Sequence, residues 1–331
     1  MKTVKITIPD NVPPIKRQTP NSSLIWGDFL FVLNGDIPEA DYWVVLDELN
    51  AQSVTCKCAP ENVFMVTGES PYIKWYSRPF SRQFAKVFTC QRNLLLRRNT
   101  VKHIPLLPWF AGAKQLDEMR LWDTENYLDY DYFLNDSPVK EFDRIAIVTS
   151  NKRMSKGHCQ RLDFIERLQK EFPDKIDLYG NGFNPIGDKY PIISKYKYQL
   201  VIENCSCPSY ITEKIMDAYL CECYPLYIGA PDIGTYFDNK SFTHLDIKNV
   251  DDAIRKIRLI FENDVYNDHI SEIKSSKKLV LDKYNIFPCI VDIINQYGVN
   301  DAKKETITLT NKHDLEWKVS MKLVSLIDKY L

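Results

Sequence analysis

The residues best suited to bind a phosphate lie just before a helical pattern in the second half of the chain. A strand-like run at Tyr198–Glu203 leads into a polar loop, and helical spacing follows at Thr212–Leu220. The first turn of that helix contains Glu213 and Lys214. A helix N-terminus offers free backbone N–H groups and the positive dipole end to an anion. Lys214 adds a full charge there, and Glu213 can accept hydrogen bonds from ribose hydroxyls. The alternative is a helix whose charged first turn simply faces water.

A carboxylate upstream is the second candidate for chemistry. Glu69 follows a strand-like run at Asn62–Thr67 and lies between Gly68 and Ser70-Pro71. A carboxylate just past a strand end, held between Gly and Pro, is placed to face a cleft between two domains. The alternative is an ordinary loop glutamate.

Metal-binding patterns are weak. Asp129 and Asp131 have the Asp-x-Asp spacing with which some transferases hold a divalent cation, but their surroundings do not indicate a strand end. The nine cysteines form Cys-x-Cys pairs and not the Cys-x-x-Cys spacing of zinc sites. We therefore predict no metal site, no divalent metal requirement for binding, and buried, reduced thiols of a cytosolic protein.

A long block in the second half resembles the signature block of the α-1,3/4-fucosyltransferases, glycosyltransferase family 10. It consists of Ser194–Asn204, Tyr210–Lys214, Asp217–Tyr219 and Tyr224–Pro231. The resemblance implies that Tyr210 contacts the nucleotide of GDP-fucose, Glu213 the ribose and Lys214 the diphosphate. Asn204, in the same block, is assigned to the donor site with them. Cys205 and Pro208-Ser209 depart from the family pattern, so the detail of this loop stays open.

Two further blocks agree in order along the chain. Val148–Asn151, Gln160-Arg161 and Asp177–Gly180 resemble the first strand, helix and second strand of the family's donor domain. This implies that Arg161 binds the pyrophosphate through its planar fork, and Ser150 is assigned to the donor site. On spacing alone Arg161 is an exposed residue of an amphipathic helix, and Arg153 competes for the same role.

The third block, Thr67-Gly68-Glu69-Ser70-Pro71, resembles the segment that carries the family's general base. The resemblance implies that Glu69 accepts the proton of an acceptor hydroxyl. The implied reaction is inverting transfer of L-fucose from GDP-β-L-fucose to a glycan or glycolipid, in α-1,3 linkage to O3 of N-acetylglucosamine, as in lipopolysaccharide. Two alternatives stay open: the same fold with another GDP-sugar, and a non-catalytic nucleotide-sugar-binding protein.

Alternation of strand-like and helical runs predicts an α/β fold. By analogy with sugar transferases we expect two Rossmann-like domains facing a cleft, the GT-B arrangement. The predicted domains are an acceptor domain at 1–138, a donor domain at 139–300 and an amphipathic helical tail at 301–331. We expect the tail to pack on a domain; peripheral membrane contact through Lys318, Lys322 and Lys329 is the alternative.

Composition excludes some classes of protein. The chain has 331 residues, 44% hydrophobic and 26% charged, with a formal net charge of -1. Such a balance gives no support for nucleic-acid binding, so anions must be bound by a few placed cations. The sequence shows no signal peptide and no run of about 18 apolar residues. We therefore expect a cytoplasmic protein.

Overall fold

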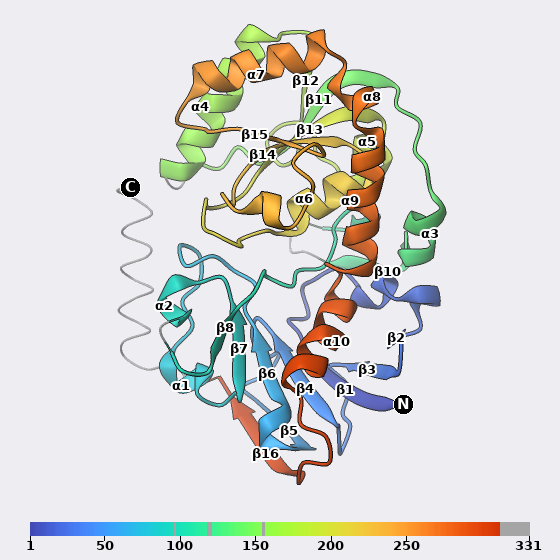
Figure 1. The fold of residues 1–331 in the computed structure, drawn as a ribbon, viewed down its shortest axis with the longest axis vertical. Coiled ribbons are helices and arrows are strands. Elements are labelled where there is room, and N and C mark those ends of the chain that lie inside the picture. Colours follow the sequence, from blue (N-terminus) through green and yellow to red (C-terminus); the bar gives the residue numbers. More distant parts are fainter. Residues whose placement is uncertain (96, 118–120, 154–155, 312–331) are drawn as a thin grey trace. The chain divides into compact units, whose positions relative to one another are not determined.

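The computed structural model describes residues 1–95, 97–117, 121–153 and 156–311. The chain divides into two compact units (Figure 1). The first unit comprises residues 1–108, 129–131 and the segment that begins at Lys283; the second comprises 109–128 and 132–282. The predicted helical tail at 301–331 is wrong in its first part, because Glu305–Thr310 form a strand that pairs with Ser53–Cys58. The rest of the predicted tail, with its alternative membrane contact, lies at 312–331, outside the described residues. No described helix is long and apolar enough to cross a membrane.

A mainly parallel sheet forms the centre of the first unit. Its strand order is β2-β3-β1-β4-β6-β7-β8, and only the pairing of β2 with β3 is antiparallel. The strand-like run predicted at Asn62–Thr67 is confirmed as β6. The bounds are β1 Lys2–Thr7, β2 Ile25–Trp26, β3 Phe29–Leu33, β4 Tyr42–Leu46, β6 Val63–Val66, β7 Lys86–Thr89 and β8 Thr100–Lys102.

Both faces of this sheet are buried, which explains why its central strands are almost wholly apolar. One face packs its apolar side chains against the short helix α1 (Arg78–Ser81) and the antiparallel strand pair of β5 (Ser53–Cys58) and β16 (Glu305–Thr310). α10 (Ile286–Tyr297) also packs on the sheet, with the Phe287 ring 4.9 Å from that of Phe31. α2 spans Arg92–Leu95.

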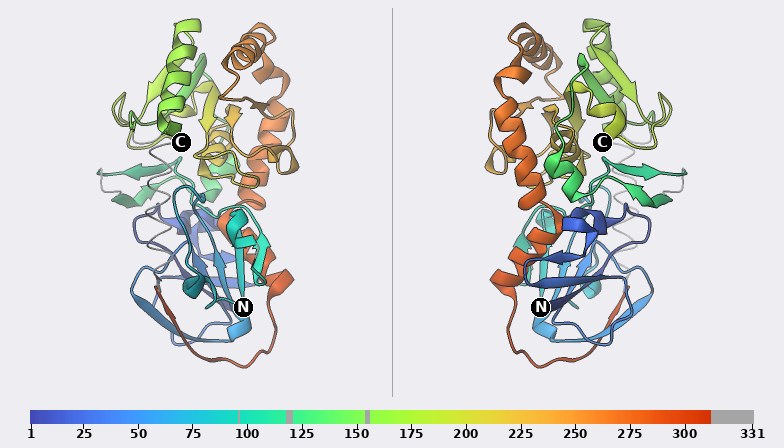
Figure 2. Two further views of the ribbon diagram at one scale, coloured as in Figure 1. Left: turned by 90° about the vertical axis from the view of Figure 1, so that its left-hand side faces the viewer. Right: turned by 90° about the vertical axis from the view of Figure 1, so that its right-hand side faces the viewer.

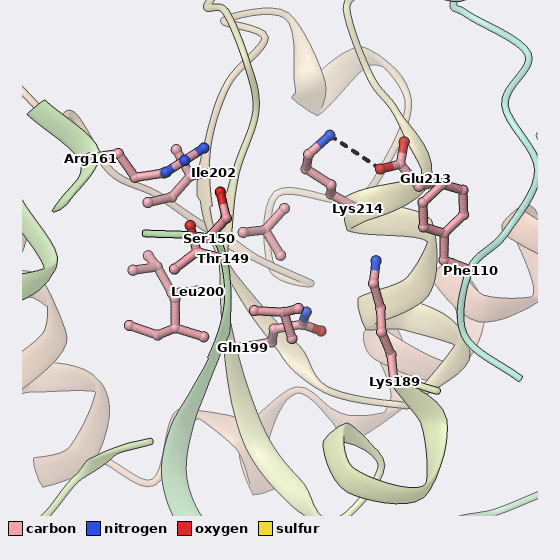
Figure 3. A pocket seen from close by; sticks show the side chains of 13 residues that line it. Phe110, Thr149, Ser150, Arg161, Lys189, Gln199, Leu200, Ile202, Glu213 and Lys214 are labelled. Carbon is pink, nitrogen blue, oxygen red and sulfur yellow. Dashed lines mark hydrogen bonds and ion pairs between the residues drawn. The ribbon is translucent and has the colours of Figure 1, made fainter. Parts of the chain in front are cut away.

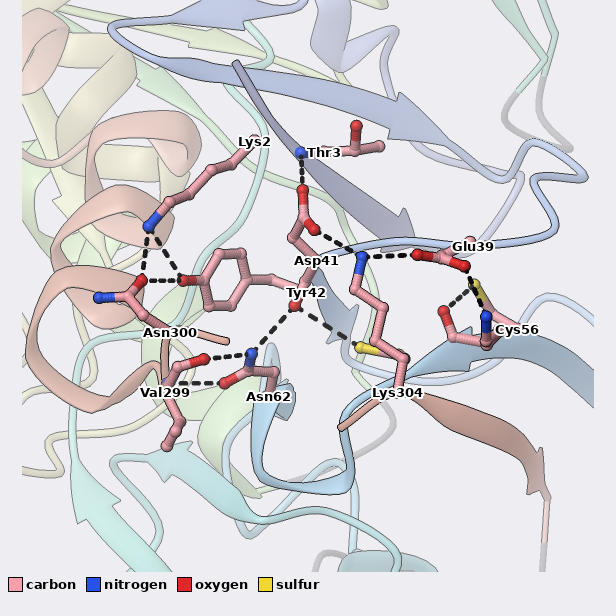
Figure 4. Close-up of polar contacts among 12 residues, drawn as sticks. Lys2, Thr3, Glu39, Asp41, Tyr42, Cys56, Asn62, Val299, Asn300 and Lys304 are labelled. Carbon is pink, nitrogen blue, oxygen red and sulfur yellow. Dashed lines mark hydrogen bonds and ion pairs between the residues drawn. The ribbon is translucent and has the colours of Figure 1, made fainter. Parts of the chain in front are cut away.

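The C-terminal segment belongs to the first unit, which corrects the predicted boundary at residue 300. Lys304 Nζ lies 2.6 Å from Asp41 Oδ1 and 2.9 Å from Glu39 Oε1 (Figure 4). The Asn62 side chain donates to Val299 O at 2.9 Å and accepts from Val299 N at 2.8 Å. The helical pattern at 286–297 gives no indication of which sheet it covers, so sequence alone misplaces it.

The boundary predicted at residue 138 also differs from the structure. Residues 109–128 belong to the second unit, where the backbone N–H groups of Phe110 and Ala111 donate to Asp217 Oδ1 at 2.9 and 3.0 Å. The prediction rested on the polar character of residues 122–140, whereas the unit is defined by these long-range bonds. The segment contains the antiparallel pair β9 (Ala113–Gln115) and β10 (Trp122–Tyr127), followed by α3 (Tyr130–Asn135).

The second unit is a doubly wound α/β fold, as predicted from its alternating pattern. Its strands are all parallel, in the order β12-β11-β13-β14-β15. α4 and α9 lie on opposite sides of this sheet (Figure 2). The strands are β11 Phe142–Val148, β12 Ile176–Tyr179, β13 Tyr196–Ile202, β14 Tyr224–Ile228 and β15 Thr243–His244. The helices are α4 Lys156–Glu171, α5 Tyr190–Ile193, α6 Glu213–Leu220, α7 Val250–Glu262, α8 Val265–Asp268 and α9 Ile270–Asp282.

This strand order has one consequence for function. The chain runs outward from β11 to β12 on one side and from β13 to β15 on the other, so the topological switch point lies between β11 and β13. In open α/β sheets ligands bind outside the carboxyl ends of the strands at such a point. The α/β fold class is therefore confirmed in each unit, whereas the cleft between them stays a prediction.

Candidate functional site: a cationic pocket at the switch point

A pocket of about 230 Å³ opens at the carboxyl ends of β11 and β13 (Figure 3). It lies at the predicted switch point and combines residues from six separate segments of the chain. Four of the residues assigned from sequence line it together: Ser150, Arg161, Glu213 and Lys214. The others are Phe110, Ile147, Val148, Thr149, Lys189, Gln199, Leu200, Val201 and Ile202.

The end of β13 holds the start of α6 in place. Glu203, buried directly after the strand, accepts hydrogen bonds from Thr212 N at 2.9 Å and Thr212 Oγ1 at 2.7 Å. Thr212 is also the N-cap of α6, and its hydroxyl accepts from Lys214 N. Burial raises the pKa of Glu203, because a charged carboxylate loses hydration there. The helix N-terminus is thus fixed against the sheet edge.

Two charged residues of the first turn of α6 project into the pocket. Lys214 Nζ lies 3.2 Å from Glu213 Oε1 and 3.4 Å from Glu203 Oε2. Burial acts to raise the pKa of Glu213, but the charges of Lys214 and Lys189 outweigh it and leave that pKa lowered. Glu213 is therefore a carboxylate at neutral pH, able to accept hydrogen bonds.

Lys189 is a pocket residue that sequence reasoning missed. Its Nζ lies 2.6 Å from Oδ2 of the buried Asp217, and the side chain points into the pocket beside Phe110 (Figure 3). Oδ1 of the same aspartate holds the backbone of Phe110 and Ala111. Nothing in the local sequence of Lys189 marks it, because its place depends on a loop about 80 residues upstream.

Arg161 reaches the pocket from the first half of α4. The side chain is half-buried, and loss of hydration lowers its pKa, although a guanidinium stays charged at neutral pH. Within the described residues its Nε is buried without a hydrogen-bond partner. The alternative of a fully exposed helix residue is thus wrong, whereas the competing Arg153 pairs with Asp163 on the surface.

Three buried polar atoms around this pocket have no partner within the described residues. They are Arg161 Nε, Thr149 Oγ1 and Gln199 Oε1. Buried polar groups in folded proteins are nearly always hydrogen-bonded, because leaving one unpaired costs about 1–3 kcal/mol. The pocket therefore has two hydrogen-bond donors and one acceptor available, which suits it to a polar ligand.

A glycine shapes the neighbouring strand end. Gly180, directly after β12, has φ +108, and a Cβ there would lie 2.0 Å from the carbonyl oxygen of Thr149. Only glycine allows β11 and β12 to end this close together.

Two residues assigned to the donor site do not line the pocket. Asn204 is exposed, two residues beyond β13, and the side chain of Tyr210 is buried in the interior. Their predicted contacts with the nucleotide stay predictions.

Glu69 lies in the first unit, directly beyond the carboxyl end of β6. The backbone around it is held by several bonds: Gly68 N donates to Asp47 Oδ1 at 3.0 Å and to the Tyr76 hydroxyl at 3.2 Å. Glu69 N donates to the same hydroxyl at 3.3 Å, and Gln91 Nε2 donates to Glu69 O at 2.7 Å. The half-buried Glu69 side chain therefore starts from a fixed backbone.

Asp47 is the centre of this network. It accepts a hydrogen bond from the Tyr76 hydroxyl and forms an ion pair of 2.6 Å with Lys74. Burial, and then the nearby Asp47 charge, raise the pKa of Tyr76 well above its usual value. Burial acts to lower the pKa of Lys74, but Asp47 and Glu48 outweigh it and raise that pKa. Lys74 therefore stays protonated, and the network binds Glu69's loop to β4.

No cluster of potential metal ligands occurs in the part of the chain that the structure describes. Asp131 Oδ2 accepts a hydrogen bond from Asn21 N at 2.5 Å. The predicted independence from metal ions stays a prediction.

A doubly wound sheet with a cationic pocket at its switch point is the arrangement of a phosphate-binding α/β domain. The comparisons with known proteins make this class more specific. Residues 139–271 match the family model "Glycosyltransferase family 10 (fucosyltransferase) C-term". This part of the chain is thus similar to the C-terminal domain of that family, and the resemblance drawn from its motifs is confirmed.

Individual relatives match parts of the chain. The chain is 40% identical over 80 residues to α-(1,3)-fucosyltransferase FucT of Helicobacter pylori, covering 24% of this chain and 16% of that protein. It is 31% identical over 146 residues to α-(1,3)-fucosyltransferase B of Drosophila melanogaster, covering 40% and 31%. The chain thus spans less than a third of the length of these curated relatives.

Solved structures give a likeness at low identity. An α1,3-fucosyltransferase crystallised with GDP-fucose is 17% identical, with a TM-score of 0.47, covering 86% of this chain and 92% of that one. A structure of α1,3-fucosyltransferase with GDP gives 18% identity and a TM-score of 0.46, covering 86% and 93%. The α/β assignment of this chain rests on its own strand order.

Proposed function

We propose that the chain is a glycosyltransferase that moves L-fucose from GDP-fucose to a sugar hydroxyl in α-1,3 linkage. One observation carries the proposal: the segment that matches the fucosyltransferase family model contains the cationic pocket and most of the residues that line it. Two relatives that match parts of the chain carry the name α-(1,3)-fucosyltransferase.

The pocket residues divide the work of holding GDP. Arg161, Lys189 and Lys214 place positive charge around the diphosphate, and the N-terminus of α6 adds its backbone N–H groups. Glu213, kept ionised by the lysines, accepts hydrogen bonds from the ribose. When GDP leaves, its diphosphate gains negative charge, and prearranged cations stabilise that charge in the transition state.

Glu69 acts as the general base. It accepts the proton of the acceptor hydroxyl while that oxygen attacks the anomeric carbon of fucose from the face opposite GDP. The C–O bond to GDP breaks through an oxocarbenium-like state, and the configuration inverts from β to α. The acceptor is O3 of N-acetylglucosamine in a glycan or glycolipid, and the reaction requires no divalent metal. The reaction takes place in a reducing compartment such as the cytoplasm, where cysteine thiols stay reduced.

Transfer of labelled fucose from GDP-fucose to N-acetyllactosamine, with and without EDTA, tests this function. We expect one labelled product with an α-1,3 linkage, formed equally in the presence of the chelator. NMR of the product reports the anomeric configuration. Transfer from GDP-mannose but not from GDP-fucose would favour the other-donor alternative. Binding of GDP-fucose without transfer or hydrolysis would favour a non-catalytic binding protein.

A further inference from the structure

A second basic pocket lies in the first unit, away from the residues assigned to the reaction. Its volume is about 550 Å³, and it is lined by Arg78, Arg82, Arg97 and Arg98 together with Phe84 and Asn99. Two arginines come from the start and C-cap of α1, and two from the residues that precede β8. None of these residues is part of the proposed reaction.

The two segments are held together by specific bonds. Asn99 Nδ2 donates to the carbonyl oxygens of Ser81 at 3.2 Å and Phe84 at 3.0 Å. Arg97 donates to the Ser81 hydroxyl. Phe84 is buried and forms the apolar floor. The arginines are thus arranged side by side by the fold, although about sixteen residues separate them in sequence.

These arginines differ from several others on the surface. Arg144, Arg167 and Arg255 each form an ion pair with a carboxylate. Within the described residues no carboxylate lies within 4.0 Å of Arg78, Arg82 or Arg98. The sequence contains no aspartate or glutamate at all from residue 70 to residue 116, while Lys and Arg recur throughout that range. In a chain of net charge -1, this positive charge is strongly local.

Clustered guanidinium groups repel each other, and the repulsion is relieved by an anion that several of them share. The planar fork of arginine matches phosphate oxygens in pairs. The pocket lies where β7 and β8 begin, whereas Glu69 follows the carboxyl end of β6, so the two occupy opposite edges of one sheet. An anion bound here does not compete for the position of the reacting hydroxyl.

We propose that this arginine pocket is a second anion site that binds a phosphate group, carried by an anionic lipid headgroup or by a soluble phosphate compound. The site is independent of the proposed sugar transfer. It gives the first unit a means of attaching to a phosphate-bearing surface or acceptor while the pocket at β11 and β13 holds the nucleotide.

The test compares two triple variants of the full chain with equal charge change. Arg78→Gln, Arg82→Gln and Arg98→Gln remove three pocket cations and leave Arg97 bonded to Ser81. The matched control carries Arg167→Gln, Arg255→Gln and Arg258→Gln, which are exposed and carboxylate-paired. Thermal unfolding without ligand checks that both variants fold.

Binding is measured by co-sedimentation with phosphatidylcholine vesicles and with vesicles containing about 30% phosphatidylglycerol, since each arginine near an anionic membrane adds about fivefold in affinity. We expect the wild type and the control to bind the anionic vesicles, and the pocket variant to bind on the order of 100-fold more weakly. A parallel arm records the thermal shift produced by inorganic phosphate in all three proteins.

The two arms distinguish the source of the phosphate. Selective loss of vesicle binding in the pocket variant supports a lipid headgroup. Selective loss of the phosphate-induced shift, without preference for anionic vesicles, supports a soluble phosphate compound. Equal behaviour of the pocket variant and the control in both arms would overturn the proposal, because the effect would then follow net charge and not the pocket.

Discussion

The carboxyl edges of the two parallel sheets both collect polar side chains, but they use them differently. At the edge of the second sheet, Arg161, Thr149 and Gln199 keep buried polar atoms without a partner among the described residues. At the edge of the first sheet, Asp47 is engaged by a lysine, a tyrosine and a backbone N–H group. Ser70 Oγ and Gln91 Oε1, next to Glu69, are likewise buried without a partner among the described residues. Unused hydrogen-bonding capacity therefore occurs at both edges, and the first edge differs in the bonded network around Asp47 that positions a loop. We infer that the second edge binds the donor and the first holds a catalytic carboxylate in place.

The largest expected effect follows from changing that carboxylate. Glu69→Gln keeps the shape of the side chain and removes its basicity. We expect kcat for fucose transfer to fall by ~10²–10⁴-fold, the usual contribution of a general base, with GDP binding unchanged. Transfer assays and GDP titrations check the two halves of this prediction. Normal transfer by the variant would assign the base to another residue.

The next effect concerns the paired hydrogen bonds that the planar guanidinium group of Arg161 can donate. Arg161→Lys keeps the charge but loses paired hydrogen bonds to the diphosphate, so we expect GDP affinity to fall about tenfold or more. Arg167→Lys, on the same helix but exposed and paired with Glu171, is the matched control and should bind GDP normally. Equal affinities in the two variants would show that Arg161 contributes charge alone or does not touch the ligand.

A smaller effect tests the supporting network in the first unit. Tyr76→Phe removes the hydroxyl that accepts from the N–H groups of Gly68 and Glu69. Loss of such neutral hydrogen bonds costs about 0.5–1.5 kcal/mol each. We expect kcat to fall about threefold to tenfold, with GDP affinity unchanged. A rise in the GDP dissociation constant without a change in kcat would contradict the division of labour between the two edges.

The smallest effect concerns the attachment of the C-terminal segment. Hydrogen bonds from Lys57 and Lys304 lower the pKa of Glu39. Partial burial acts to raise the pKa of Asp41, but the hydrogen bond from Lys304 outweighs it and leaves that pKa lowered. The two ionised carboxylates therefore stabilise the folded state at pH values above their ordinary pKa values of 4.5 and 3.8. This contribution is lost as the pH falls through their lowered pKa values in the folded protein.

Lys304→Met should therefore lower the unfolding temperature by about 1–3 °C at pH 7, and the difference should vanish below about pH 3. Lys303→Met, at an exposed neighbouring lysine, should leave the pH profile unchanged. A constant difference from pH 7 to pH 3 would show that packing of the lysine stem, and not its charge, holds the segment.

How much the sequence revealed depends on whether a feature is local. The strand–loop–helix block around Glu213 and Lys214 was predictable, because periodicity, an N-cap and a recognisable motif lie within a few residues. Lys189 and Phe110 were not, since they reach the pocket through Asp217, whose partners lie far apart in the chain. The misassigned boundary at residue 300 has the same cause. An amphipathic pattern shows that α10 must cover an apolar surface, but not which of two sheets supplies it.

Thermal unfolding with GDP, UDP, CMP and AMP, for the wild type and Lys214→Ala, tests most directly the claim that the pocket at β11 and β13 binds the donor nucleotide. A ligand at 100 times its dissociation constant adds about 2.7 kcal/mol of stability, which appears as a shift of a few degrees. The account predicts stabilisation by GDP alone, lost in Lys214→Ala. Stabilisation by GDP that persists in Lys214→Ala, or no shift with any nucleotide, would contradict it.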